Sequence, residues 1–254
     1  INGSNIMKNV FVLLMLAMMF SGQARAVSSC IYGRVIKDNK VQSYYWSKYN
    51  PSISYDNKFR RGSCKQSSIN KYWKDFGMEK KYWDDGMGYY STCDAYKPLN
   101  RMFNAIRVLH ISKNSSQSSN AMLNHAYGYS KGSIKHLRVK CGTNDRTNAS
   151  MSNRIVKFYW KGIYNKVVVE RALTLLHEAR HRHKGHNGGK KCPCKCSCDS
   201  KWSYNGSNTY GALYGWWYGY YAKNSNTVLK NIALNDAQWN IDNRFVKHPG
   251  YRVR

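Results

Sequence analysis

The feature that most constrains the fold is an apolar stripe with helical spacing over residues 166–181, KVVVERALTLLHEARH. This segment contains neither Pro nor Gly, so nothing in it interrupts a helix of about four turns. A helix with such a stripe buries one face, and we expect it to lie against the core of the protein. The stripe consists of Val168, Ala172, Leu175, Leu176 and Ala179. Helix breakers follow at Gly185, Gly188, Gly189 and Pro193.

Strand patterns precede this helix. Residues 30–46 alternate apolar and polar side chains around Asp38, Asn39 and Lys40, which predicts a β-hairpin. Weaker alternation predicts strands within residues 133–141 and 154–164.

Two further segments have helical spacing. We expect a helix over residues 100–111, with Asn100 as its N-cap, and another over residues 227–245. The expected fold class is therefore α+β, with a β-rich, aromatic N-terminal part and a helical C-terminal part that carries the helix over residues 166–181.

Glycine recurs every four residues within residues 210–222, at Gly211, Gly215 and Gly219. On a helix these three positions form one bare face, which allows another helix to approach closely. Such a helix could pack against the helix that carries His177, with its aromatic residues beside a substrate cleft. An aromatic core element, or a loop without a helix, is the alternative.

An export signal is predicted at residues 7–26. Lys8 supplies a positive start, residues 10–20 are apolar, and residues 24–26 form an A-x-A cleavage site. The apolar run is shorter than the roughly 20 residues that cross a bilayer. We therefore expect residues 1–6 to lie upstream of the natural start, and the mature chain to be exported to the periplasm or the extracellular space with no transmembrane span.

The mature chain, residues 27–254, is expected to form a single domain, in which residues 27–100 are either a β-rich subdomain or a pro-segment. The whole sequence carries a formal charge of +28. This imbalance predicts attraction to anionic polymers, although an AT-rich genome also favours a chain rich in Lys and Asn. A non-catalytic cationic envelope protein that binds a cell-wall polymer, lipopolysaccharide or nucleic acid is therefore an alternative function.

The chain has eight cysteines, and in an exported protein disulfides are the default. Four are dispersed, namely Cys30, Cys64, Cys93 and Cys141, and four alternate in CPCKCSC, namely Cys192, Cys194, Cys196 and Cys198. An extended chain would place the four alternating cysteines on one side. Disulfides that join this cluster to dispersed cysteines are one interpretation, and a structural zinc site with four cysteine ligands is the other.

His177 and His181 are four residues apart, so on a helix both imidazoles lie on one face and can bind the same metal ion. Glu178 lies one position further round, outside the ligand pair but close to water on the ion. Zinc lowers the pKa of bound water to about 7, and a nearby Glu can take its proton as the water attacks a peptide carbonyl. The pattern H-E-x-x-H therefore predicts a zinc-dependent peptidase with Glu178 as general base.

A catalytic zinc ion usually has a third protein ligand. No Glu follows Glu178, so a third ligand from a glutamate on a later helix is excluded unless an earlier residue substitutes for it. We favour His186, because Gly185 permits a sharp turn that returns the chain to the ion. The other candidates are His183, His248, Asp199, Asp236 and Asp242. Cationic residues also stabilise a helix C-terminus, so these histidines have a non-catalytic explanation as well.

The segment HEARHRHKGH, residues 177–186, resembles the extended zinc motif of the metzincin metallopeptidases, HExxHxxGxxH, over about a dozen residues. It is also similar to a segment of uncharacterised exported bacterial proteins regarded as zinc peptidases. The resemblance implies a zincin-like fold and a protein or peptide substrate. In this chain Gly185 and His186 are adjacent, so His186 comes one position earlier than the third histidine of the motif, and no Met-turn is evident.

Overall fold

The computed structural model describes residues 34–37, 40–43, 51–83, 87–114, 116, 118, 121–140 and 148–253. The predicted export signal, Cys30 and Cys141 lie outside these residues. The α-helices are α2 (Pro51–Ser63), α3 (Gln66–Asp75), α4 (Pro98–Ile111), α5 (Met122–Ser133), α6 (Trp160–Tyr164), α7 (Val168–Arg180), α8 (Ser207–Tyr221) and α9 (Thr227–Asn243). The strands are β1 (Arg34–Lys37), β2 (Lys40–Ser43), β3 (His136–Lys140), β4 (Ala149–Ser152) and β5 (Ile155–Tyr159). The 3-10 helices are η2 (Lys80–Tyr82) and η3 (Trp202–Tyr204).

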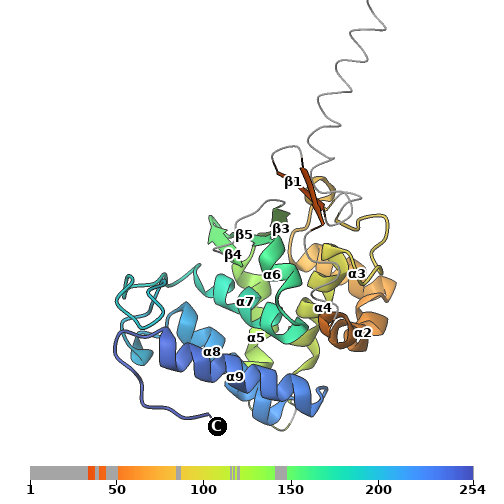
Figure 1. The fold of residues 1–254 in the computed structure, drawn as a ribbon. Helices are drawn as coiled ribbons and strands as arrows, with labels where there is room; N and C mark the ends of the chain where they lie inside the picture. Colours follow the sequence, from red (N-terminus) through yellow and green to blue (C-terminus); the bar gives the residue numbers. More distant parts are fainter. Residues whose placement is uncertain are drawn as a thin grey trace, which may run out of the picture.

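The architecture is mixed α+β, as predicted. Strands β3, β5 and β4 form a small sheet in that order, with β3 parallel and β4 antiparallel to β5. The sheet lies at one end of a mainly helical body (Figure 1). The predicted strand over residues 154–164 is correct only in its first half, because the chain turns into α6 at Trp160.

The prediction of a β-rich N-terminal part is wrong beyond the first hairpin. Strands β1 and β2 pair antiparallel around residues 38–39, as expected. The chain then forms α2 and α3, in which Phe59 and Tyr72 are buried in the hydrophobic core, and Phe76 is buried directly after α3. Tyr72 and Phe76 are four residues apart, so a helix places both side chains on the same face, toward the core. This packing outweighs the preference of aromatic residues for strands.

Helix α4 begins at Pro98 with Lys97 as its N-cap, so the prediction of Asn100 as the N-cap is wrong by three residues. Proline suits the first helical position because it lacks the N–H group that would have no partner there. Asn100 is buried inside the helix, where its Nδ2 donates to the carbonyl oxygen of Thr92 at 2.9 Å. Its amide therefore holds the segment before α4 against that helix.

Helix α7 lies at the centre of the molecule, and the prediction of a helix with one buried face is confirmed. All five residues of its apolar stripe are fully buried. Helices α4 and α5 pack on it together with α8 (Figure 1). Among the described residues, no helix combines the length and the apolarity that crossing a membrane requires.

The predicted helix with a bare glycine face is also confirmed, as α8. A Cβ atom at Gly215 would lie 2.8 Å from the carbonyl oxygen of Ala233 and 3.0 Å from Leu173. A Cβ atom at Gly219 would lie 2.3 Å from the side chain of Leu234. The glycines therefore let α8 pack tightly against α9 and α7, which determines where the N-terminus of α8 lies relative to the histidines of α7.

Candidate metal centre

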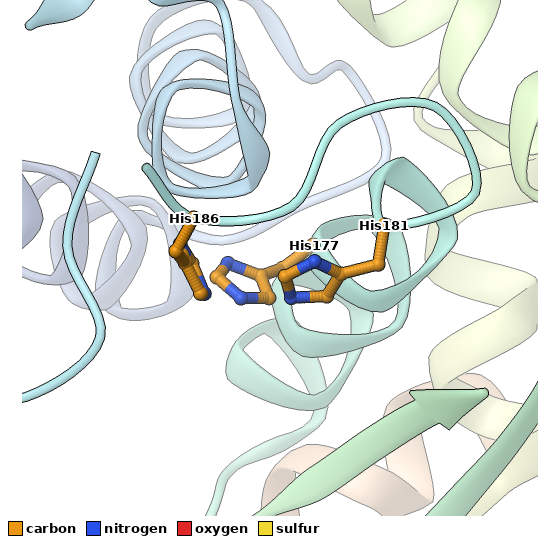
Figure 2. Close-up of side chains that lie close together, drawn as sticks. All are labelled: His177, His181 and His186. Carbon is orange, nitrogen blue, oxygen red and sulfur yellow. The ribbon is translucent and has the colours of Figure 1, made fainter. Parts of the chain in front are cut away.

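The end of α7 and the segment after it bring His177, His181 and His186 together (Figure 2). One ligand nitrogen from each ring lies within 4.8 Å of the other two. The ring centroids are 5.1 Å apart for His177 and His181, 5.2 Å for His177 and His186, and 4.7 Å for His181 and His186. Three imidazoles this close can face a single metal ion.

Backbone hydrogen bonds turn the chain directly after α7, so that the segment with His186 lies close to the end of this helix. The N–H groups of His183 and Lys184 donate to the carbonyl oxygen of Arg180 at 2.9 Å and 3.0 Å. The turn was expected at Gly185, but Gly185 does not adopt the left-handed conformation, and the chain turns before it. The tight turn directly after α7 is what places His186 opposite the other two rings.

Asp199 orients His186. Its Oδ1 lies 2.9 Å from His186 Nδ1, and its side chain is 0% exposed. The other oxygen, Oδ2, accepts the N–H groups of Asn208 at 3.1 Å and of Thr209 at 3.4 Å, at the start of α8. With Nδ1 directed at a carboxylate, His186 presents Nε2 to an ion, which is the arrangement of histidine ligands in many metal proteins.

Ser207 orients His181 in a similar way. Its hydroxyl lies 3.1 Å from His181 Nδ1 and donates to the carbonyl oxygen of Lys184 at 3.2 Å. A hydroxyl that donates there can accept the Nδ1–H of His181, which leaves Nε2 for an ion. His177 faces Gly211 of α8, where a Cβ atom would be 3.9 Å from its ring, so the first glycine of α8 borders the site.

Burial keeps two of these imidazoles, those of His177 and His181, neutral. Burial lowers the pKa of His177 well below its usual value, and His181 and His186 add to the effect. Burial and the neighbouring His186 lower the pKa of His181 to about 4. Neutral imidazoles have a free lone pair at neutral pH, which metal binding requires.

Glu178, the residue after His177, is also buried, with 6% of its surface exposed. Burial raises the pKa of its carboxyl to about 8, against the opposing charge of Arg244. No hydrogen bond or ion pair joins this carboxyl to another residue in the described part of the chain. A divalent cation beside it would favour the ionised form and lower the pKa again.

The other candidates for the third ligand lie elsewhere. Asp199 contacts the Nδ1 atom of His186, and the carboxylate of Asp236 lies 3.9 Å from the Lys166 amine. His183 is exposed and its ring lies 5.8 Å from that of Tyr129, so it points away from the site as expected. His248 pairs with Asp242 at 3.1 Å near the C-terminus.

Asp199 as an orienting residue, Ser207 and Gly206 were not found from the sequence. A Cβ atom at Gly206 would lie 2.5 Å from Asp199 Oδ2, so only glycine lets this carboxylate reach the start of α8. One signal was available, since Asp199 is the only acidic residue between Glu178 and Asp236. Ser207 carried no such signal.

The cysteine cluster lies in the loop between His186 and Asp199, and the prediction of disulfides is confirmed. Disulfides join Cys192 to Cys198 and Cys194 to Cys196, and a third joins Cys64 to Cys93. The predicted bridges from the cluster to dispersed cysteines are wrong, because the alternating cysteines are close enough in the chain to pair among themselves.

Comparison with protein-family models, with curated proteins and with solved structures finds no match for this chain.

Proposed function

We propose that the protein is an exported zinc-dependent metallopeptidase with a zincin-like centre. The observation that carries the proposal is the convergence of His177, His181 and His186. It is supported by Glu178, the residue after His177, whose buried carboxyl has no hydrogen bond or ion pair among the described residues. The signal-like residues 7–26 and the disulfides support export.

The residues present fit zinc, because three converging imidazoles, two of them oriented through Nδ1, are the ligand set of many catalytic zinc sites. When bound, zinc supplies a Lewis acid that polarises a peptide carbonyl and increases the acidity of water. Glu178 takes a proton from the attacking water at its carboxylate and passes it to the leaving amine. Asp199 and Ser207 keep His186 and His181 in the orientation that binding needs.

Zinc stoichiometry of the purified, chelator-rinsed protein tests the ligand set. We expect about one zinc per chain in the natural protein, loss of zinc in His177→Ala, and retention in His183→Ala. His183 is the matched control because it is a histidine of the same segment that lies outside the cluster.

Three outcomes would contradict the proposal. Zinc that persists in His177→Ala would place the ion elsewhere. Zinc that is lost equally in His183→Ala would point to nonspecific binding by a histidine-rich segment. A zinc-loaded protein that hydrolyses no peptide in a broad substrate mixture would remove the peptidase activity.

A cationic binding protein is the second candidate, favoured by the distribution of charge. Seven of the nine acidic side chains in the described residues form ion pairs with Lys, Arg or His. The chain has 41 Lys and Arg against 13 Asp and Glu, so such pairs leave most of its positive charge uncompensated and able to attract a polyanion. Polyanion binding that weakens steeply with salt, in a protein without zinc, would favour this function.

A further inference from the structure

The cysteine cluster gathers the sulfur atoms of two disulfides into one place. The Sγ atoms of Cys192, Cys194 and Cys196 all lie within 4.8 Å of one another. Cys192 Sγ and Cys194 Sγ belong to different disulfides, yet they are 3.3 Å apart. Cys198 is bonded to Cys192, so its sulfur is adjacent to the same group.

Backbone hydrogen bonds hold this loop independently of the disulfides. The N–H of Gly188 donates to the carbonyl oxygen of Cys198 at 2.8 Å, and the N–H of Cys198 donates to that of Gly189 at 3.0 Å. Within the loop, the N–H of Lys195 donates to the carbonyl oxygen of Cys192 at 2.9 Å and closes a turn with Pro193 at its second position. The sulfur atoms are therefore brought together by the backbone as well as by their own bonds.

A second tie connects the loop to the end of α9. The N–H of Cys194 donates to the carbonyl oxygen of Asn243 at 3.3 Å, and the N–H of Asp199 donates to that of Arg244 at 3.1 Å. These hydrogen bonds join backbone atoms and not sulfur atoms, so they can hold the thiols near one another when the disulfides are open.

The two disulfides of the cluster constrain the chain less than the third one. Cys194 and Cys196 are two residues apart and Cys192 and Cys198 are six apart, whereas Cys64 and Cys93 are 29 apart. Because the stabilisation from a disulfide increases with the length of the loop that it closes, the bonds of the cluster contribute less to the folded state.

We propose that the cluster is a second metal site, formed when its two disulfides are reduced. The thiolates of Cys192, Cys194 and Cys196, with Cys198 as a fourth, bind one thiophilic cation such as Zn²⁺. Each disulfide gains two electrons and two protons from a dithiol, which becomes a disulfide itself. The cation then displaces the protons of the thiols that it binds.

The surroundings suit a thiolate site. The N–H of Cys192 donates to Cys198 Sγ at 3.3 Å, and such a bond stabilises charge on sulfur. Lys190, Lys191 and Lys195 are exposed on the same loop and offset the negative charge of several thiolates. The site uses none of the three histidines, so it does not depend on the proposed peptidase activity.

Cadmium provides the test, because Cd²⁺ bound to thiolates has an ultraviolet charge-transfer band that Cd²⁺ bound to imidazoles lacks. The full chain carrying His177→Ala, which removes the histidine centre, is reduced with a phosphine and titrated with Cd²⁺. We expect one equivalent to give the band. We expect the band to disappear when Cys194→Ser and Cys196→Ser are added, although the other cysteines remain, and to persist when Cys64→Ser and Cys93→Ser are added as the matched control.

Absence of the band in the reduced chain would overturn the proposal, as would a band that survives Cys194→Ser with Cys196→Ser or disappears with Cys64→Ser and Cys93→Ser. Circular dichroism is recorded at each step. If reduction unfolds the chain, the proposal requires Cd²⁺ to restore the helical signal, and failure to restore it counts against the site.

Discussion

The two ends of α7 each bury an ionisable side chain, but only one of these side chains has a partner among the described residues. Near the start of the helix, Arg171 is fully buried and forms an ion pair with Asp56 of α2. Its Nη1 also donates to the carbonyl oxygens of Ile163 at 3.0 Å and Lys166 at 2.6 Å. Near the end, Glu178, the residue after His177, is buried without a partner among the described residues.

The difference shows how burial can serve either structure or chemistry. A buried ion pair with further hydrogen bonds stays charged and connects distant elements, here α2 and α7. A buried carboxyl without a partner has a raised pKa, which costs stability in the folded protein and suits proton transfer. We therefore expect changes at the two ends to affect different measurements.

The largest expected effect is that of Glu178→Gln on catalysis. If Glu178 is the general base, peptide hydrolysis should fall by about 10²- to 10⁴-fold. Zinc content should not change, because Glu178 is not one of the converging ligands. Glu170→Gln is the control, since this acid lies on the same helix and pairs with Lys166. Full activity in Glu178→Gln would show that the buried acid near the end of α7 has no catalytic role, in contrast to what we propose.

Arg171→Met should mainly reduce stability. It leaves Asp56 buried without its cation, and we expect the free energy of unfolding to fall by about 3–5 kcal/mol in urea titrations. The double variant Arg171→Met with Asp56→Leu should recover much of this loss, because no buried charge then remains unpaired. A single variant as stable as the natural protein would show that the pair has no structural role.

Gly206→Ala tests whether Asp199 prepares the histidine site. The added Cβ atom would meet the Asp199 carboxylate and displace it from His186. We expect zinc affinity to fall by about 10- to 100-fold, as measured by competition with a chelator. Gly185→Ala is the matched control, because no atom lies within 4 Å of a Cβ added there. Equal affinities in the two variants would mean that Asp199 does not support the site.

Asp75 extends the comparison to a paired acid outside α7. Burial alone would raise its pKa, but hydrogen bonds from Tyr127, Lys131 and Lys71 outweigh burial and lower the pKa to about 2. The unfolded chain then binds a proton at a higher pH than the folded protein does. About 2 kcal/mol of stability should therefore be present above pH 4 and lost as the pH falls toward 2.

Unfolding of the natural protein and of Asp75→Asn, measured across this pH range, checks the prediction for Asp75. The variant should be less stable above pH 4 and should lack this part of the pH dependence. The same acid-induced loss of stability in both proteins would assign it to other carboxyls.

The predictions that held rest on local periodicity. Four features follow from residues that are close together along the chain. They are helix α7, the shared face of His177 and His181, the bare face of α8 and the antiparallel pairing of β1 with β2. The helices at residues 51–75 were missed because their aromatic residues favour strands until packing against α4 is considered.

The sequence by itself determined the two histidines that α7 presents together and the acid between them, because a helical repeat acts within four residues. Only the tertiary structure decided that His186 joins them, since this depends on Asp199, 13 residues later, and on the start of α8. Ser207, 26 residues beyond His181, is a second example. Contacts between such distant positions arise from packing of whole helices, and no local pattern encodes them.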